Sequence, residues 1–268
     1  MNISFIGGGI MAEAMIKGIL QSQILTAGNI SIGEISSQRR EYLEQTYKVK
    51  TYSDNLKAIN NSDIIILSVK PQNVLEVSEK LSNNIPKSVT IISIVAGLSL
   101  KDLTEAFNLK SIIRVMPNTP AQIGSGMTVW LPTDNVSKKI NDFTKAVLES
   151  LGKEIQVKDE NYLNIATALS ASGPAYVFLF ISSLIDAGVY LGIPRDLSRQ
   201  LVLQTVLGSC QMLIDSNDHP SALVDRVTSP GGTTIEALLT FEQGAGRATI
   251  METVIAAYEK SIELGQQN

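Results

Sequence analysis

A short strand that runs straight into a glycine-rich turn and an apolar helix constrains the fold of this chain more than any other feature. Residues 2–6 alternate between polar and apolar side chains, and the segment Gly7-Gly8-Gly9-Ile10-Met11-Ala12 follows before a helical apolar stripe. This is the G-x-G-x-x-G/A arrangement in its strand, turn and helix context. Gly7 permits the tight turn, Gly9 lets a pyrophosphate approach the backbone, and Ala12 keeps the helix close to the strand. The pattern predicts a dinucleotide-binding unit.

The end of the second expected strand bears on the choice of dinucleotide. Residues 29–33 predict this strand, and Glu34 follows it. An acidic residue there binds the adenosine ribose 2′-OH and favours NADH. Ser36-Ser37 and Arg39-Arg40 follow within one turn; they are suited to a 2′-phosphate, which favours NADPH, but they also fit a solvated helix face. The sequence leaves the choice between NADH and NADPH open.

Further apolar runs predict the rest of a doubly wound parallel sheet, and each run ends in small or polar residues. Ligands of such sheets lie at the carboxyl ends of the strands. We therefore interpret Lys70 as a cofactor or substrate contact, with a plain surface lysine as the alternative, and expect Val95-Ala96-Gly97 to leave room for a nicotinamide. Asn118 and its neighbour Thr119 stand in a stiff loop between two prolines. The expected strands are residues 64–69, 89–94, 112–116, 127–131 and 154–157, with a helix over residues 136–151.

Strand signals stop near Lys158, so we expect an α/β dinucleotide-binding domain over residues 1–158 and an all-helical domain over residues 159–268. A helix beginning at Asn161 should kink at Gly173-Pro174, because proline removes a hydrogen bond and clashes with the preceding turn. The segment that continues to Gly192 is apolar on nearly every side and must be covered all round. A second subunit is the simplest way to cover this apolar segment, so an obligate homodimer is predicted. Later helices are expected over residues 194–216, 220–224 and 247–264.

A loop in the second half is a candidate ligand site. Ser229-Pro230-Gly231-Gly232-Thr233-Thr234 opens directly into a helical pattern. Amides at a helix N-terminus, flanked by hydroxyls, make a cradle for a small carboxylate. An ordinary helix N-cap by serine or threonine explains the same residues. The loop alone does not decide between the two.

Composition excludes several other classes of function. The 268 residues are enough for two domains, and 44% hydrophobic with 18% charged residues is typical of a globular protein. A net charge of −4 argues against a nucleic-acid partner. The single cysteine, Cys210, is expected in a helical core, and the single histidine, His219, in a turn before a proline. Neither a metal cluster nor a nucleophilic triad can be built from them.

No membrane span and no signal peptide are expected from the apolar runs and the N-terminal residues, so a cytoplasmic location is predicted. The expected site also holds almost no proton-transfer residue: the sequence has no lysine between Lys158 and Lys260. Oxidation of an alcohol generally needs a general base near the oxygen. Reduction of an imine demands less, since a protonated C=N is already an electrophile and needs mainly orientation over the nicotinamide.

The whole length of the chain resembles the pyrroline-5-carboxylate reductase family. The resemblance rests on the glycine turn, on Ser68-Val69-Lys70-Pro71, on residues 116–121, on Ser172-Gly173-Pro174-Ala175-Tyr176 and on residues 229–237. It implies reduction of the cyclic imine 1-pyrroline-5-carboxylate to L-proline by NADPH or NADH, the last step of proline biosynthesis. It also implies a dimer, or a ring of dimers, in which partner helices complete the active site.

The resemblance further implies roles for individual residues. Residues 6–11, including Gly7, Gly9, Ile10 and Met11, would hold the pyrophosphate. Other cofactor contacts would be Glu34, Ser36, Asn55, Ser68, Val69, Lys70, Pro71, Val95 and Ala96. Ser229, Gly232, Thr233 and Thr234 would bind the substrate carboxylate, the Thr233 hydroxyl would hydrogen-bond the ring nitrogen, and Glu160 would lie near the substrate. Many family members have a neutral residue at the position of Glu34, and this departure leaves their usual NADPH preference open here.

Two other functions are compatible with the sequence. A β-hydroxyacid dehydrogenase has a similar nucleotide domain but uses a lysine early in its helical domain, which is missing here. A catalytically silent relative that only binds the cofactor is the second alternative, and the intact loop at Ser229 argues against it.

Overall fold

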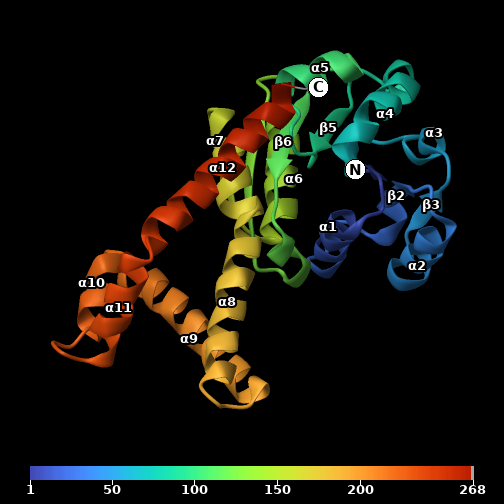
Figure 1. Ribbon diagram of the computed structural model, residues 1–268. Helices are drawn as coiled ribbons and strands as arrows, with labels where there is room; N and C mark the ends of the chain where they lie inside the picture. The colour runs from blue at the N-terminus through green and yellow to red at the C-terminus, as the bar shows by residue number, and fades with distance from the viewer. Residues whose placement is uncertain (267–268) are drawn as a thin grey trace. The chain divides into compact units, whose positions relative to one another are not determined.

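A computed structural model describes residues 1–266 of the chain (Figure 1). The chain divides into two compact units, which are described one at a time. The first unit contains residues 1–172 together with the final turns of the last helix from Ala257 on, and the second is Gly173–Ala256. The domain boundary at residues 158 and 159 was drawn where strand signals end, and as a functional division it stays a prediction.

The first unit is built on one eight-stranded sheet within the described residues, with the strand order β3-β2-β1-β4-β5-β6-β7-β8. All neighbouring strands pair in parallel except β6 and β7, which are antiparallel. The order reverses between β1 and β4, which is the point where doubly wound sheets bind ligands. The strands are β1 (Ile3–Ile6), β2 (Ile30–Gly33), β3 (Lys50–Tyr52), β4 (Ile64–Leu67), β5 (Thr90–Ser93), β6 (Ile112–Met116), β7 (Gly126–Pro132) and β8 (Gly152–Gln156).

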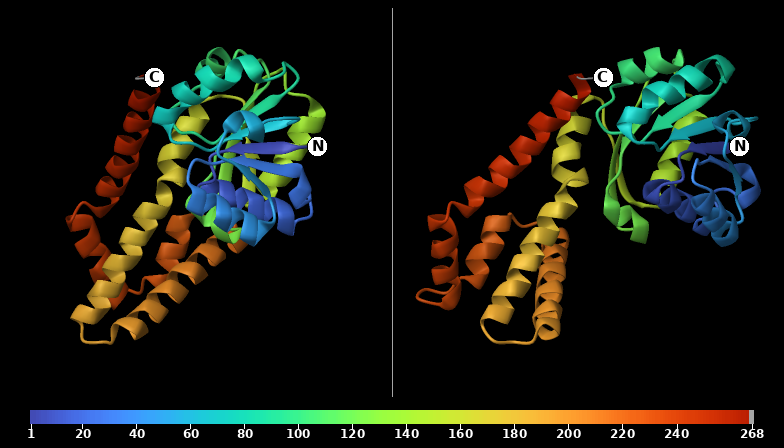
Figure 2. Two further views of the ribbon diagram at one scale, coloured as in Figure 1. Left: turned by 90° about the vertical axis from the view of Figure 1, so that its right-hand side faces the viewer. Right: turned by 45° about the vertical axis from the view of Figure 1, so that its right-hand side comes forward.

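Helices cover both faces of the sheet (Figures 1 and 2), and an apolar core lies between the sheet and the helices on each face. One core joins β1 and its neighbours to helices α1, α2 and α6 through fully buried residues such as Met15, Leu43 and Leu148. The other core joins the sheet to α4 and α5 through Val77 and Phe107, among others. The helices of this part are α1 (Ile10–Gln21), α2 (Ser37–Tyr47), α3 (Asn55–Ala58), α4 (Val74–Leu81), α5 (Leu100–Phe107) and α6 (Lys138–Glu149), with short 3₁₀ turns η1 (Ala27–Asn29), η2 (Pro71–Asn73), η3 (Ser82–Asn84) and η4 (Thr119–Ile123).

The predicted α/β class is confirmed, and the predicted strands appear along the chain with one strand added. Strand β3 was not predicted, because Lys-Thr-Tyr is too short and too polar to carry an alternating pattern. It pairs only with β2, at the edge of the sheet. Such a strand is ordered by its neighbour rather than by its own sequence.

The predicted kink at Gly173-Pro174 is replaced by a change of helix type before it. Helix α7 (Asn161–Ala166) passes into one stretch of π-helix, η5 (Thr167–Ala171), and α8 (Gly173–Tyr190) starts afresh. Pro174 therefore stands in the first turn of α8, where a missing N–H costs little. Within the first unit, α7 packs on β6 and β7 through Leu163 and Ala166.

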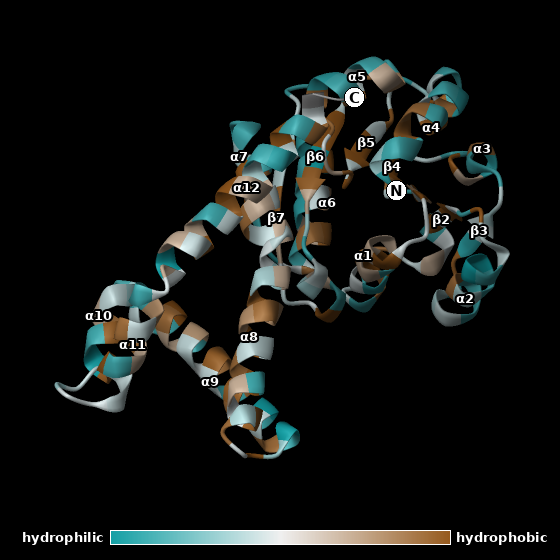
Figure 3. Cartoon of the chain, in the orientation of Figure 1, coloured by the Kyte–Doolittle hydropathy of each residue, from teal (hydrophilic) through white to brown (hydrophobic). Residues whose placement is uncertain are grey.

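The second unit is entirely helical within its described residues, as predicted. It contains α8 from Gly173 on, α9 (Arg195–Ser216), α10 (Pro220–Val227), α11 (Thr233–Gln243) and the first part of α12 (Gly246–Gln266). Figure 3 shows apolar residues spread along these helices. Few of them are buried within the chain, since Gly173 and Ser198 are the buried residues on α8 and α9.

Candidate cofactor and substrate site

The glycine turn after β1 has the backbone that a bound pyrophosphate needs. Gly7 has a φ of 97°, and its N–H donates to the Gly33 carbonyl at 2.8 Å. A Cβ on Gly7 would stand only 2.7 Å from the Ser68 carbonyl oxygen, so no other residue fits there. A Cβ on Gly9 would meet nothing within 4 Å, and Gly9 precedes α1 without a side-chain cap. The first-turn amides of α1, beside the exposed Ile10, are therefore available to a phosphate.

The carboxyl ends of the central strands lie along the same edge of the sheet as this turn, because β1, β4 and β5 are adjacent and parallel. The Ser68 hydroxyl donates to the Gly7 carbonyl at 2.7 Å and fixes the end of β4 to the turn. Lys70 is exposed at that end, and its side chain has no hydrogen-bond or ion-pair partner within residues 1–266. Val95 follows β5 and is 2% exposed. Asn55 packs against Gly33, where a Cβ would overlap its side-chain oxygen. The predicted cofactor residues of the sheet edge thus come together.

Glu34 lies between the glycine turn and the first turn of α2. Its Oε2 accepts from the Gly8 N–H at 2.9 Å, and its Oε1 accepts from the Ser36 N–H at 2.8 Å. Ser36 is the N-cap of α2, and its hydroxyl accepts from the Arg39 N–H. The ribose end of the predicted site is therefore an ordered network.

The loop at Ser229 belongs to the second unit and connects α10 to α11. Gly231 has a φ of 67°, and Gly232 is the N-cap residue of α11 with no side-chain cap. Within residues 1–266 no hydrogen bond engages the hydroxyls of Ser229, Thr233 or Thr234. The simple N-cap explanation of these hydroxyls therefore fails, because none of them caps α11. The start of α11 therefore has no side-chain cap.

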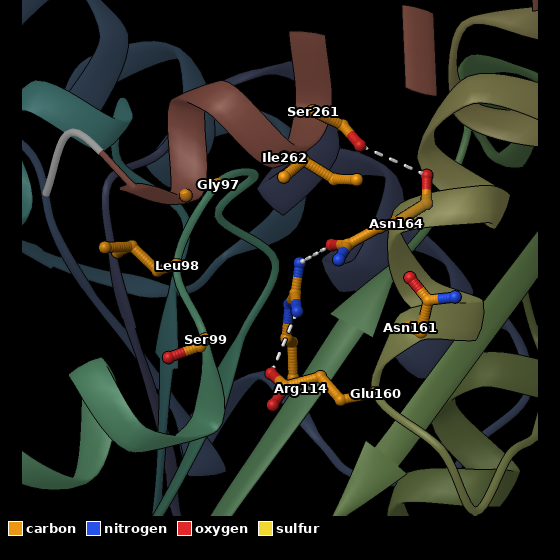
Figure 4. Close-up of a pocket in the computed structure, with 10 residues that line it drawn as sticks. Gly97, Leu98, Ser99, Arg114, Glu160, Asn161, Asn164, Ser261 and Ile262 are labelled. Carbon is orange, nitrogen blue, oxygen red and sulfur yellow. Dashed lines mark hydrogen bonds and ion pairs between the residues drawn. The ribbon is translucent and has the colours of Figure 1, made fainter. Parts of the chain in front are cut away.

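Glu160 lies in a cavity of about 290 Å³ in the first unit (Figure 4). Its Oε1 accepts from Arg114 Nη1 at 2.9 Å and from the Leu100 N–H at 2.7 Å. Arg114 is 3% exposed, and its second Nη donates to Asn164 at 3.0 Å. These contacts tie β6 and α5 to α7. The predicted substrate role of Glu160 stays a prediction, and one of its oxygens already has two internal partners.

Two structural residues of this part were not predicted from the sequence. Arg114 was read only as part of an apolar strand, although a charge inside such a run signals a buried ion pair. Asn118 was noticed as an amide in a stiff loop, without a partner. Its Oδ1 accepts from the Met127 N–H at 2.9 Å, and its Nδ2 donates to the Ser170 carbonyl at 3.1 Å.

Other singled-out residues have structural explanations. His219 precedes α10, and its Nδ1 accepts from the Ser221 N–H at 3.2 Å, which confirms the turn prediction. Cys210 is exposed in the single chain, so its prediction as a core residue is wrong, because no element within residues 1–266 buries it on α9. Within residues 1–266 no three histidine, cysteine or carboxylate side chains gather in a way that suits a metal ion.

One described segment is long and apolar enough to span a membrane by length and composition alone. It is Asn161–Tyr190, with a mean hydropathy of 1.6. It passes on its mean hydropathy, whereas the expectation from the sequence concerned an unbroken run of about 18 apolar residues, which this segment does not contain. A soluble helix that is covered by another subunit passes the same test.

A doubly wound, largely parallel sheet with a glycine turn at its switch point, followed by an all-helical unit, is the architecture of a nicotinamide-dependent oxidoreductase. Residues 2–97 match the family described as "NADP oxidoreductase coenzyme F420-dependent", and residues 160–264 match "Pyrroline-5-carboxylate reductase dimerisation". The chain belongs to the pyrroline-5-carboxylate reductase family. It is an NAD(P)H-dependent enzyme that reduces 1-pyrroline-5-carboxylate to L-proline in proline biosynthesis.

Relatives support this assignment over the full length. A pyrroline-5-carboxylate reductase of Synechocystis sp. is 40% identical over 100% of this chain and 99% of the relative. That of Escherichia coli is 34% identical over 98% of each. A crystal structure of Plasmodium falciparum pyrroline carboxylate reductase with NADP bound has a TM-score of 0.91 and 35% identity, covering 99% of this chain and 98% of that one.

Proposed function

We propose that the loop at Ser229 is the part of this enzyme that holds the substrate. Ser229, Gly232 and Thr234 bind the carboxylate of 1-pyrroline-5-carboxylate, and the Thr233 hydroxyl hydrogen-bonds the ring nitrogen. The observation that supports this assignment is the uncapped start of α11, where amides and hydroxyls without internal partners point to an anionic ligand. When bound, the reduced nicotinamide supplies the hydride.

The residues at the sheet edge would hold the cofactor. The α1 amides after Gly9 receive the pyrophosphate, Glu34, Ser36 and Asn55 border the adenosine ribose, and the residues after β4 and β5 border the nicotinamide. In the last group are Ser68, Val69, Lys70, Pro71, Val95 and Ala96. The enzyme groups then act by orientation, since an imine that is already protonated needs no strong base in the protein.

Replacing Thr233 with Ala tests the proposed mechanism. We expect kcat to fall by about 10²-fold or more, because the hydroxyl bonds the nitrogen where charge changes during the reaction. Nicotinamide fluorescence should give nearly unchanged dissociation constants for the cofactors, because Thr233 does not border them. Thr240→Ala is the matched control, since this exposed hydroxyl on the same helix donates to the Glu236 carbonyl of its own helix. An unchanged kcat in Thr233→Ala would remove Thr233 from the mechanism.

The assembly and location follow from the same assignment. Residues 160–264 match a dimerisation domain, and the apolar sides of α8 and α9 need cover, so we infer a homodimer. A ring of dimers is a further possible arrangement of the same surfaces. An enzyme of amino-acid biosynthesis that uses reduced nicotinamide works inside the cell, and we place it in the cytoplasm. No role with nucleic acid is proposed, in keeping with the net charge of −4.

A further inference from the structure

The residues after β2 contain both an acidic group that suits NADH and two arginines that suit the 2′-phosphate of NADPH. Their contacts distinguish between these interpretations. The Glu34 carboxylate accepts from the Gly8 N–H at 2.9 Å and from the Ser36 N–H at 2.8 Å. Backbone amides at a turn and at a helix start are the donors that a phosphate would use. The carboxylate of Glu34 therefore occupies both donors.

Arg39 is committed to the protein rather than to a ligand. Its Nε donates to the Gly8 carbonyl at 2.6 Å, and one Nη donates to Glu13 at 2.5 Å and to the Gly9 carbonyl at 3.3 Å. Its guanidinium also lies 5.0 Å from the centre of the Tyr42 ring. Arg39 thus stabilises the backbone of the glycine turn through hydrogen bonds to its carbonyls.

Glu13 holds the Arg39 guanidinium in this position. Both Tyr42 and Tyr47 donate their hydroxyls to the Glu13 carboxylate, at 2.9 and 2.8 Å. Burial raises the pKa of Glu13, but the hydrogen bonds from Arg39, Tyr47 and Tyr42 outweigh it and lower the pKa below the ordinary 4.5. The carboxylate is ionised at neutral pH and keeps its bond to Arg39. Breaking this pair to serve a ligand would leave Glu13 without its cation.

Arg40 also forms its hydrogen bonds within the protein. One Nη donates to the Glu34 carbonyl at 2.7 Å and to the Ile35 carbonyl at 2.9 Å. It therefore holds the backbone that follows β2. This role requires the guanidinium but no bound phosphate.

We propose that Glu34 makes this enzyme selective for NADH, and that Arg39 and Arg40 shape the loop instead of binding a 2′-phosphate. The proposal rests on the cofactor site assigned above and names its preferred dinucleotide. Hydroxyls of the adenosine ribose are hydrogen-bond donors to a carboxylate. A 2′-phosphate brings a negative charge to the same place, and juxtaposed like charges oppose binding.

The test is a set of binding titrations of the full-length protein with NADH and with NADPH, in the absence of substrate. Nicotinamide fluorescence is the signal. The wild-type protein should bind NADH at least about tenfold more tightly than NADPH. Glu34→Gln removes the charge and keeps the shape. It should reduce the ratio of the two dissociation constants at least about tenfold, mainly by tighter NADPH binding.

Two controls separate charge from structure. Glu41→Gln removes a negative charge from an exposed residue of α2 whose side chain has no hydrogen-bond or ion-pair partner within residues 1–266, and it should leave the ratio unchanged. Arg40→Ala should change the affinities for NADH and NADPH by the same factor. A thermal unfolding scan of each variant verifies that the titrated protein is folded.

Three outcomes would overturn the proposal. They are a wild-type ratio near one or in favour of NADPH, an unchanged ratio in Glu34→Gln, and a selective loss of NADPH binding in Arg40→Ala. Binding of neither cofactor would overturn it together with the cofactor site. Selective NADH binding without turnover of 1-pyrroline-5-carboxylate would leave the inference standing and contradict the proposed substrate site.

Discussion

The Asn118 side chain supplies a hydrogen-bond donor where Pro174 lacks one. Pro174 has no N–H, so the carbonyl four residues before it, on Ser170, lacks its usual helical donor. The Asn118 side chain supplies that donor at 3.1 Å and accepts from Met127 with its other atom. The Asn118 side chain is 9% exposed, and both of its hydrogen bonds are partly buried. Asn118 therefore fixes the π-helical turn before α8 to the sheet.

Replacing Asn118 with Ala should destabilise the first unit. The change removes one hydrogen-bond partner from the Met127 N–H and one from the Ser170 carbonyl, at a cost of about 2–3 kcal/mol in the free energy of unfolding. Urea unfolding measures this cost. Asn84→Ala is the control, because Asn84 is exposed and its bond to the Lys80 carbonyl is long, at 3.3 Å. A loss in Asn118→Ala no larger than in the control would refute the assigned role.

At the scale of elements, helix α8 exposes large apolar side chains that a partner surface would bury. Phe178, Leu179 and Phe180 are 62%, 70% and 52% exposed in the single chain. Consecutive residues of a helix point in different directions, so this exposure surrounds the helix. Burying such side chains contributes roughly 1.5–3 kcal/mol each. A partner surface on α8 explains why this helix passes a membrane test in a protein of this family.

A charge on this surface should break the dimer. Phe178→Asp would bury an unpaired carboxylate in the interface, and we expect sedimentation velocity to show monomer where the wild type shows dimer or a higher assembly. Gln45→Asp introduces the same charge at an exposed site on α2 and should keep the wild-type assembly. A dimer of unchanged strength in Phe178→Asp would mean that other helices form the interface.

For the molecule as a whole, the sequence predicted what depends on periodicity and on local rules. The buried strand Ile64–Leu67 is a uniform apolar run, and the glycine turn requires its residues through backbone geometry, as the close approach of Gly7 to Ser68 shows. Family resemblance supplied the reaction and most candidate residues. Nothing local to the Ser229 loop distinguished a cap from a cradle.

What escaped prediction depends on contacts between distant segments. Glu34, Arg39 and Arg40 bind backbone atoms and a carboxylate of helix α1. No sequence pattern predicts these partners. The ion pair of Arg114 with Glu160 joins residues that are 46 positions apart. The return of the α12 end to the first unit, where the Tyr258 hydroxyl donates to Asn161 at 3.0 Å, likewise requires the folded chain.

The most direct test of the account measures product and cofactor together. Purified, folded and dimeric protein is mixed with 1-pyrroline-5-carboxylate and NADH or NADPH, the loss of nicotinamide absorbance is followed, and L-proline is quantified. The account predicts one L-proline formed for each reduced nicotinamide oxidised, with NADH the more efficient cofactor. Absence of proline with both cofactors would contradict the assigned reaction and leave a protein that only binds the dinucleotide.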